Sequence, residues 1–514
     1  MLVKTFGSAV YGVEAITITI EVNVNNKGQH YYIVGLPDNA IKESLQRVES
    51  AIKNNALYMP RTKLVVNLAP ADIKKSGTAF DLPIAIGTLG ATEQLDFPEQ
   101  LSDYLIMGEL SLDGHIRPIK GALAIALQAS TENFKGLILP AENAEEAALV
   151  DNIDVFPVSH LNDVINFFSS ERSLKKISVN GTERFKSSQE IFDVDFCDVK
   201  GQENIKRALE IAAAGGHNAI LIGPPGAGKT MLAKRIPTIL PPISLKEALE
   251  TTKIHSVAGK LPSHSSLISQ RPFRSPHHTI SDVALVGGGG MPQPGEISLA
   301  HNGVLFLDEL PEFKRTVLEV MRQPMEERKV TISRARLALD FPASFMLIAS
   351  MNPCPCGFYN HPDRDCLCAP GTVQKYLNKI SGPLLDRIDL HVEVTPVAFN
   401  ELSSVSNSET SNEIRSRVIS AREIQKERFA KEQNVYANAH MSRRKLKEVC
   451  NIEAGSRQLL KSAMEKLNLS ARAYDRILKV SRTIADLEAN EDIKPHHIAE
   501  AIHYRSLDRS GWGA

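Results

Sequence analysis

An eight-residue stretch, GPPGAGKT at residues 223–230, directly follows the apolar run 219–222. Strand, glycine-rich turn and helix form the usual context of a phosphate-binding loop, because glycines let backbone N–H groups curl toward an anion. Lys229 is placed to reach the outer phosphates of a nucleotide, and the hydroxyl of Thr230 is placed to hold Mg²⁺. The residues predicted to contact the nucleotide are Gly223, Pro224, Pro225, Gly226, Ala227, Gly228, Lys229 and Thr230.

A second apolar run, residues 304–307, ends in two acids, Asp308 and Glu309. In P-loop enzymes the first acid holds Mg²⁺, and the second orients and activates the attacking water. Two acids at a strand end can also be merely solvated, but the loop upstream favours the catalytic interpretation. The two motifs together predict an ATPase that uses ATP and Mg²⁺.

Three further polar residues follow in order along the chain. Asn352 comes directly after the apolar strand 347–350, where its amide can contact the γ-phosphate and the water together. Arg387 lies between apolar residues, and Arg472 opens a helix capped by Ser470. Such an Arg is often only part of a surface ion pair. The order of all five elements resembles the AAA+ superfamily, which implies that Asn352 is sensor 1, Arg387 the arginine finger acting on a neighbouring subunit, and Arg472 sensor 2.

Length and composition bound the possibilities. The chain has 514 residues, of which 43% are hydrophobic and 23% charged, as expected for about three soluble globular domains. Its net charge is −1, so any contact with nucleic acid must come from local basic patches. We find no apolar run long enough to span a membrane and no apolar core of a signal peptide near Met1, which predicts a cytoplasmic protein.

The pattern along the chain predicts an α/β protein whose P-loop AAA+ core is preceded by a mixed α/β domain and followed by a helical lid. Apolar residues alternate from Ile16 to Val24, as in a half-buried strand, and a helix is expected behind an Asp38 cap. Polar stretches at 169–190 and 401–412 read as linkers. The predicted domains are 1–168, the first α/β domain; 191–400, the ATPase core; and 413–506, the lid.

Four of the six cysteines lie between residues 354 and 368, in two Cys-x-Cys pairs: Cys354, Cys356, Cys366 and Cys368. Four thiolates can close a tetrahedral Zn²⁺ site, although the one-residue spacing is tighter than is usual. His361 lies within the loop and could replace one cysteine. Four reduced thiols on a surface loop are the alternative, and a disulfide pair is disfavoured in the cytoplasm.

Four long strings give the closest family resemblance: residues 274–289, 294–313, 350–357 and 469–487. In them the chain resembles the YifB/ComM family of magnesium-chelatase-like ATPases over nearly its whole length. The resemblance implies a homohexamer that binds branched or single-stranded DNA. The best-understood member of that family is a helicase that migrates DNA branches during natural transformation, the route to competence. Alternatives are an ATPase subunit that drives metal insertion into a tetrapyrrole, and an ATP-driven protein remodeller.

Residues 319–339 are predicted to form a helix and a hairpin that carries Lys329, Arg334 and Arg336. The stretch looks like the corresponding region of minichromosome maintenance helicases and magnesium chelatase subunits, which often place such a hairpin at the pore of the ring. The resemblance makes these three cations candidate DNA contacts. A solvated basic hairpin is the alternative.

Residues 108–121 of the first domain resemble the proteolytic domain of Lon proteases, which use a Ser–Lys dyad. The resemblance places Ala79 at the nucleophile and Ile125 at the base. Neither side chain can perform that chemistry, so we expect a Lon-like fold without peptidase activity.

Overall fold

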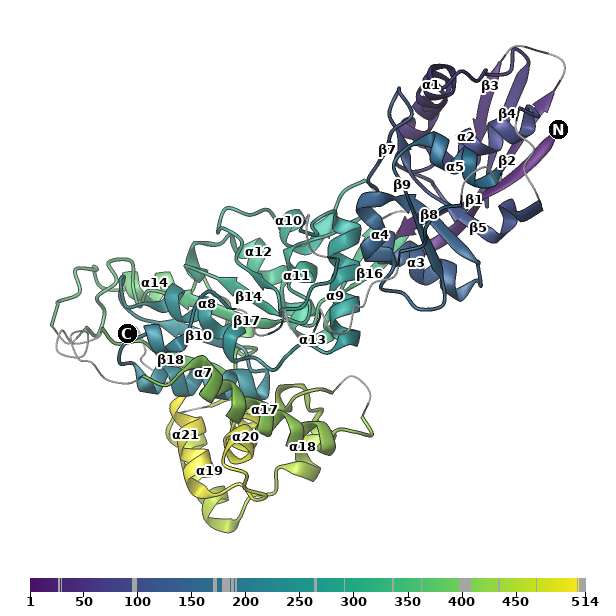
Figure 1. Cartoon of the computed structure of the whole chain (residues 1–514). Helices are drawn as coiled ribbons and strands as arrows, with labels where there is room; N and C mark the ends of the chain where they lie inside the picture. Colours follow the sequence, from purple (N-terminus) through teal and green to yellow (C-terminus); the bar gives the residue numbers. More distant parts are fainter. Residues whose placement is uncertain are drawn as a thin grey trace. The chain divides into compact units, whose positions relative to one another are not determined.

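The computed structural model describes residues 1–507 except 26–27, 29, 95–98, 170–172, 178–184, 186–188, 190–191, 263–265, 291, 335–336, 362, 397–407, 433–434, 468 and 506. The chain divides into two compact units, and Figure 1 labels their elements. Unit 1 is Met1–Ser187 with Leu245–Ser269, and unit 2 is Ser188–Ser244 with Gln270–Ala514.

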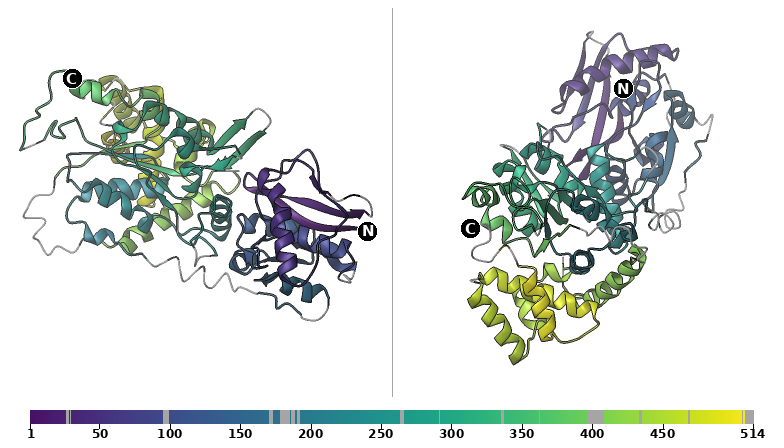
Figure 2. Two further views of the ribbon diagram at one scale, coloured as in Figure 1. Left: turned by 90° about the horizontal axis from the view of Figure 1, so that it is seen from above. Right: turned by 90° about the vertical axis from the view of Figure 1, so that its left-hand side faces the viewer.

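Unit 1 is built on a seven-stranded sheet in the order β3-β4-β2-β1-β5-β8-β9. The long strands β1 and β2 run antiparallel, and they are drawn in purple in Figures 1 and 2. Ile18, Ile20 and Val22 of β2 are buried at every second position, which confirms the strand predicted from the alternation. The strands are β1 (Leu2–Tyr11), β2 (Glu14–Asn25), β3 (Tyr31–Val34), β4 (Lys63–Ala69), β5 (Tyr104–Ile106), β8 (Gly136–Pro140) and β9 (Asp154–Val158), with a separate hairpin of β6 (Glu109–Leu110) and β7 (Ile116–Arg117).

The helices of unit 1 belong to two apolar clusters. The predicted cap is present, since Asp38 accepts a hydrogen bond from the N–H of Ile41 at 2.9 Å. Ala79 and Ile125, the positions that the resemblance assigns to the Lon dyad, pack in one apolar cluster, and Ile125 is buried. The helices are α1 (Asn39–Asn54), α2 (Asp81–Ala91), α3 (Ala122–Thr131), α4 (Ala141–Ala147), α5 (Leu161–Phe168) and α9 (Leu245–Ala258).

Helix α9 lies within the segment 191–400 that the sequence predicts to be ATPase core, yet it packs in unit 1. Lys253 pairs with Glu14 at 2.7 Å, and the N–H of Gly121 donates to the carbonyl of Ser256 at 3.3 Å. Val257 is buried in the cluster that contains α3. These are contacts between residues distant in sequence, which a local pattern does not reveal.

Unit 2 holds a five-stranded parallel sheet in the order β11-β14-β17-β10-β18. Its inner strands are buried along their whole length, as the continuous apolar runs of the sequence predict. Two hairpins, β12–β13 and β15–β16, lie outside this sheet. The strands are β10 (Ala219–Ile222), β11 (Phe273–Arg274), β12 (Gly287–Gly288), β13 (Gln293–Pro294), β14 (Val304–Leu307), β15 (Lys329–Arg334), β16 (Leu337–Pro342), β17 (Met346–Met351) and β18 (Leu390–Glu393).

The C-terminal part of unit 2 is helical, as expected for a lid. One apolar cluster joins β10 and α7 to the lid residues Val418, Ile477 and Ile498. The lid helices are α17 (Ser411–Arg428), α18 (Arg443–Val449), α19 (Ala454–Lys466), α20 (Ala471–Leu487) and α21 (Pro495–His503). The core helices are α7 (Glu203–Gly215), α8 (Lys229–Ile239), α10 (Asp282–Val286), α11 (Glu296–Leu299), α12 (Arg315–Val320), α13 (Arg322–Glu327), α14 (Thr372–Leu377) and α15 (Gly382–Leu385).

A buried ion pair gives unit 1 a testable weak point. Arg47 of α1 reaches both carboxylate oxygens of Asp81 in α2, at 2.6 and 3.0 Å, and the Asp81 side chain is wholly buried. Arg47→Ala leaves that charge without its partner, so we expect a loss of about 3–5 kcal/mol in unfolding free energy. Urea unfolding followed by circular dichroism measures it. Lys53→Ala removes the exposed pair with Glu49 and is the control; equal shifts for both variants would contradict the analysis.

Candidate active site

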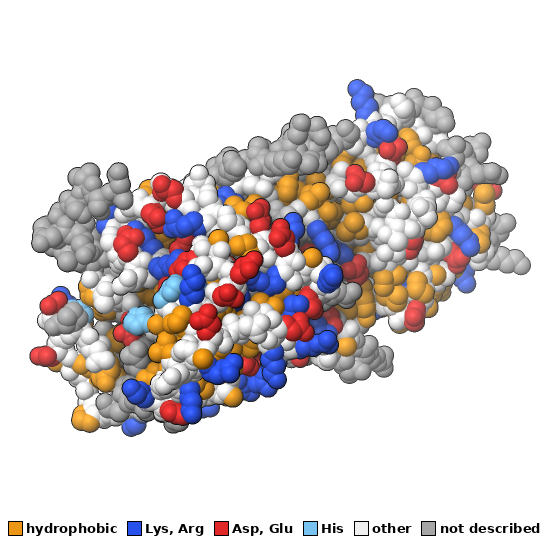
Figure 3. All heavy atoms as spheres, turned by 90° about the horizontal axis from the view of Figure 1, so that it is seen from below, with side chains coloured by type: hydrophobic (Ala, Val, Ile, Leu, Met, Phe, Trp, Pro, Cys, Tyr) orange, Lys and Arg blue, Asp and Glu red, His pale blue; other side chains and the backbone are white. Residues whose placement is uncertain are grey.

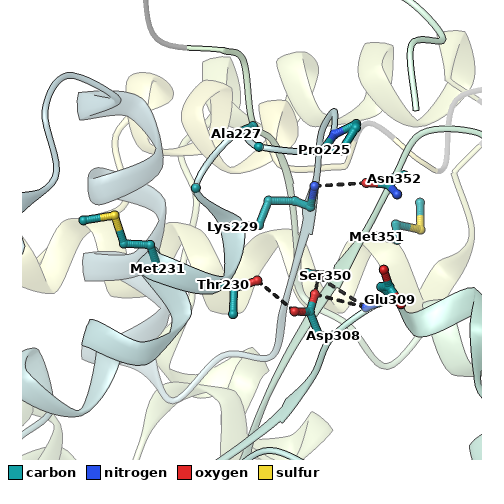
Figure 4. Close-up of a pocket in the computed structure, with 12 residues that line it drawn as sticks. Pro225, Ala227, Lys229, Thr230, Met231, Asp308, Glu309, Ser350, Met351 and Asn352 are labelled. Atoms are coloured by element: carbon teal, nitrogen blue, oxygen red, sulfur yellow. Dashed lines mark hydrogen bonds between the residues drawn. The ribbon is translucent and has the colours of Figure 1, made fainter. Parts of the chain in front are cut away.

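The glycine-rich loop predicted to bind phosphate joins the end of β10 to the start of α8. Gly226 and Gly228 have φ of 80° and 81°, a left-handed conformation that favours glycine. The loop borders a cavity of about 430 Å³ at the start of α8, where the helix dipole favours an anion (Figure 4). The cavity is lined by Pro225, Gly226, Ala227, Gly228, Lys229, Thr230, Met231, Asp308, Glu309, Ser350, Met351 and Asn352.

Lys229 is folded back over the loop. Its ammonium donates to the carbonyls of Gly223 and Pro224 at 2.7 and 2.9 Å, and to Oδ1 of Asn352 at 3.1 Å. Burial lowers the pKa of Lys229, while the nearby Asp308 and Glu309 oppose that effect. Lys229 and Asn352 therefore lie within reach of one another, as two groups that contact the same phosphate must.

Asp308 is held by three donors. Thr230 donates its hydroxyl hydrogen to Oδ2 at 2.8 Å, the hydroxyl of Ser350 donates to Oδ1, and the N–H of Glu309 also donates to Oδ1 at 3.1 Å (Figure 4). Hydroxyl and carboxylate oxygens are the ligands that Mg²⁺ prefers. The Thr230–Asp308 pair thus has the donor atoms and the proximity that a shared Mg²⁺ requires.

Glu309 sits at the turn after β14 with φ of 54°, which is uncommon for a residue with a side chain. Its side chain is 57% exposed, and its carboxylate lies 3.6 Å from Nδ1 of His278. Glu309 lines the same cavity as Asn352 and Asp308, so a water molecule in that cavity could contact the Glu309 carboxylate.

Two neighbours of these acids were not predicted as site residues. Ser350 is the residue before the last in the buried strand β17 and contacts Asp308; a polar residue near the end of an apolar strand was the available signal. His278 contacts Glu309 from the segment after β11, and nothing in the local sequence indicates that contact. Arg274, nearby in sequence, is paired with Glu296 at 2.6 and 2.9 Å.

Arg387 lies at the opposite edge of the sheet from the glycine-rich loop. β18 pairs in parallel with β10, Leu390 opposite Ala219, so Arg387 precedes the strands whereas the loop follows them. A four-residue strand spans about 13 Å. The Arg387 guanidinium is instead 2.6 Å from Glu326 and donates to the carbonyl of Pro383 at 2.5 Å. It does not line the cavity of its own chain.

Arg472, at the start of α20, is also remote from this cavity. Its guanidinium lies 3.1 Å from the carboxylate of Asp386, one residue before Arg387. The structure therefore brings Lys229, Thr230, Asp308, Glu309 and Asn352 together at one edge of the sheet, and places Arg387 and Arg472 together at the other. The roles of all seven stay predictions.

The four clustered cysteines converge. All four sulfur atoms lie within 4.8 Å of one another. Three of the sulfur–sulfur distances are 3.3 Å (Cys354–Cys356), 3.7 Å (Cys354–Cys366) and 3.6 Å (Cys356–Cys366), too long for disulfide bonds. Tetrahedral zinc with Zn–S bonds of about 2.3 Å requires about 3.8 Å between sulfurs, so the geometry fits the metal.

Cys356 is the one thiol of the cluster whose pKa is lowered, whereas the pKa values of Cys354, Cys366 and Cys368 are raised. Burial raises the pKa of Cys356, but hydrogen bonds from the backbone N–H of Phe358 and the thiol of Cys354 outweigh it and lower the pKa to about 6. His361 is not part of the cluster: its Nδ1 accepts a hydrogen bond from the N–H of Asp363 at 3.0 Å. The four thiols alone thus provide a complete ligand set.

The basic hairpin predicted to contact DNA is formed by β15 and β16. Lys329 pairs with Asp340 across it at 2.8 Å. Arg336 and the side chain of Arg334 lie outside the described residues, so their contacts stay predictions. On the face drawn in Figure 3, Lys and Arg side chains are interspersed with Asp and Glu rather than gathered in one large basic area.

Among the described residues, no helix has the length and apolar character needed to cross a membrane.

Comparisons with known families cover most of the chain. The model described as "Subunit ChlI of Mg-chelatase" matches residues 20–143. "Magnesium chelatase, subunit ChlI" matches residues 195–402, and "Magnesium chelatase, subunit ChlI C-terminal" matches residues 408–505. The matched regions contain the cavity, both arginines and the cysteine cluster.

Two individual relatives match nearly the whole chain, and a third matches part of it. The competence protein ComM of Haemophilus influenzae is 44% identical over 514 residues, 99% of this chain and 98% of that protein. YifB of Salmonella typhimurium is 44% identical over 504 residues, 98% of this chain and 96% of that protein. Lon protease 2 of Bacillus subtilis is 32% identical over 162 residues, 29% of this chain and 28% of that protein.

Two substitutions in the cavity should separate nucleotide binding from hydrolysis. Lys229→Ala removes the cation that faces the phosphates, so we expect ATP binding to be lost. Glu309→Gln keeps the shape of the site but removes the base, so we expect binding to persist while kcat falls about 100-fold or more. Fluorescence anisotropy with a labelled ATP analogue and a phosphate-release assay measure the two effects. Loss of binding in Glu309→Gln, or normal hydrolysis in either variant, would contradict these roles.

Proposed function

Since the chain belongs to the YifB/ComM family of magnesium-chelatase-like AAA+ ATPases, with a Lon-like N-terminal domain, we propose that it is a ring-forming ATP-dependent motor that acts on DNA. Its action is branch migration or unwinding in recombination or natural transformation, in the cytoplasm. The name of the Haemophilus influenzae relative, a competence protein, supports this proposal at 44% identity over the whole chain.

The hydrolytic chemistry follows from the cavity. The loop N–H groups and Lys229 would hold the phosphates, and Thr230 and Asp308 would hold Mg²⁺, which would supply neutralisation of phosphate charge. Glu309 takes the proton of the attacking water, and Asn352 positions that water against the γ-phosphate. His278, 3.6 Å from Glu309, is placed to influence the orientation of that carboxylate.

The position of Arg387 is the observation that best supports assembly of several copies into a ring. It lies at the edge of the sheet away from its own cavity, and its side chain is only 10% exposed and is paired with Glu326. Its Nε has no hydrogen-bond partner among the described residues. From that edge of the sheet, Arg387 could act as an arginine finger only on a γ-phosphate bound in the cavity of a second copy placed beside it. Arg472 lies beside Asp386 at the same edge and would sense the neighbour's nucleotide. Six copies closed into a ring, a homohexamer, give every cavity such a neighbour.

The remaining parts have supporting roles. Cys354, Cys356, Cys366 and Cys368 bind a structural Zn²⁺, since all four positions of a tetrahedron are filled by protein. The Lon-like domain is not a peptidase, because Ala79 and Ile125 form part of an apolar cluster where a nucleophile and base would stand. The boundaries 1–168, 191–400 and 413–506 describe these parts, with α9 packed in unit 1.

A second function is favoured by the family descriptions themselves, which name magnesium chelatase subunits. In that case the ring would drive metal insertion into a tetrapyrrole. The competence relative matches the whole chain, which supports the DNA motor instead, whereas the model matched by residues 20–143 does not separate the two functions. A protein remodeller that uses the Lon-like domain to bind adaptors is the third candidate.

ATPase rates with and without a four-way DNA junction test the choice. We expect the junction to stimulate hydrolysis at low salt and the stimulation to fall as salt rises, because phosphate contacts release counterions. Lys329→Ala, which removes one candidate contact, should reduce the dependence of log affinity on log salt by about 1. The exposed Lys135, paired with Asp103 in unit 1, supplies the control Lys135→Ala, and Glu309→Gln supplies the blank.

A rate that ignores every DNA tested, while ordered rings form, would refute the DNA motor. Stimulation by a tetrapyrrole and its partner subunits would then favour the chelatase function. Recovery of protein clients without DNA would favour the remodeller.

A further inference from the structure

The cysteine cluster and the proposed ATP site are adjoining parts of one structure. Asn352, which contacts Lys229, is separated from Cys354 by Pro353 alone, and Cys354 is completely buried. The first ligand of the cluster therefore begins two residues after the amide that faces the γ-phosphate. Because only one residue separates them, a displacement of Cys354 should also displace Asn352.

The cysteine loop also touches the phosphate-binding loop itself. Gly357 has φ of 86°, and a Cβ placed on it would lie 2.5 Å from Cδ of Pro225. A side chain at position 357 would collide with the Pro225 ring, so the cysteine loop packs directly against this residue of the glycine-rich loop. The N–H of Gly357 donates to the carbonyl of Cys354 at 3.0 Å, which ties this contact to the buried cysteine.

The far end of the cysteine loop returns to the same place. After Cys368 the chain enters α14, whose Tyr376 is only 7% exposed. Burial raises the pKa of Tyr376, and the backbone of Asn352 is near enough to oppose that effect. Both ends of the cysteine loop, Cys354 at its start and α14 after its end, therefore lie close to Asn352.

The four cysteines are the cross-links that join the two ends of this loop, and within it the Arg364 guanidinium also lies 5.1 Å from the centre of the Phe358 ring. Its described residues between Pro353 and Gly371 form turns but no helix or strand, and Leu367 is 86% exposed. A segment with so little buried apolar surface gains its order from cross-links, and a metal bound by four thiolates supplies folding free energy directly.

We propose that Zn²⁺ bound by Cys354, Cys356, Cys366 and Cys368 is a brace of the ATP site, which holds Asn352 and Pro225 in their working positions. The proposal rests on the proposed function in taking the cavity to be the ATP site. It assigns the cysteines a positioning role in nucleotide binding and hydrolysis, rather than a role in contacting DNA or a neighbouring subunit. Loss of the metal should then impair an isolated cavity as well as a ring.

The test compares three variants of the full chain. Cys368→Ser removes a ligand, Cys368→His restores one of a kind that zinc accepts, and Cys197→Ser changes a cysteine of the same unit outside the cluster. Elemental mass spectrometry gives the zinc content, anisotropy gives the Kd for a labelled ATP analogue, and phosphate release gives kcat. Hydrogen exchange of residues 352–376 reports the order of the loop directly.

We expect the unchanged chain and Cys197→Ser to hold about one zinc per chain. Cys368→Ser should lose the zinc, bind the analogue more weakly and lose about 100-fold in kcat, because a misplacement near 1 Å costs that much. Exchange of residues 352–376 should rise in this variant, and Cys368→His should recover zinc, affinity and rate together.

If Cys368→Ser fails to fold, a zinc-selective chelator applied to the folded native chain replaces it. Affinity for the analogue should then fall and return on addition of Zn²⁺, but not of Mg²⁺ alone. A zinc-free chain that binds and hydrolyses ATP normally would refute the proposed positioning role of zinc. A native chain that contains no zinc would refute it as well. A native chain with its zinc that does not bind the ATP analogue would instead refute the proposed ATP site.

Discussion

The parallel pairing of five strands in unit 2 determines where every polar group of the candidate site lies. β10 lies between β17 and β18, and β14 flanks β17, all running in one direction. The residues that follow these strands therefore meet at one edge, which brings Lys229, Asp308 and Asn352 around one cavity. The residues that precede β18, including Arg387, are held at the other edge. No rotation of a side chain brings the two sets together within one chain.

The lid is joined to the edge that carries Arg387 by buried polar contacts. His217 lies 3.3 Å from Asp389 and 2.8 Å from Thr483 of α20, and Arg476 of the same helix lies 2.7 Å from Asp389. Burial opposes the charge of Asp389, but Arg476 and His217 hold its pKa below the usual range. Since unpaired buried charges are costly, these contacts hold α20 against the start of β18, close to the backbone beside Arg387.

Local sequence patterns predicted the parts of the structure that depend on local forces. The alternation in β2, the Asp38 cap and the order of loop, acids and amide each depend on a few neighbouring residues, and the structure has them. Contacts across the chain could not be read in the same way. Ser350 and His278 meet the acids only after folding, and α9 leaves the ATPase segment to pack in unit 1. The place of Arg472 beside Asp386 likewise depends on how the lid packs. The cysteine spacing indicated a metal, but only the fold places the loop against Pro225.

Mixing two inactive variants tests most directly whether the site is completed by a neighbouring subunit. Lys229→Ala lacks a working cavity but keeps its finger, and Arg387→Ala keeps its cavity but lacks the finger. In rings assembled from equal amounts of both, about a quarter of the sites combine a sound cavity with a sound finger, so ATPase activity should reappear. A mixture of Lys229→Ala with Glu309→Gln, both defective in the cavity, should stay inactive. If the first mixture is as inactive as the second although mixed rings form, Arg387 does not act between subunits and the account is wrong.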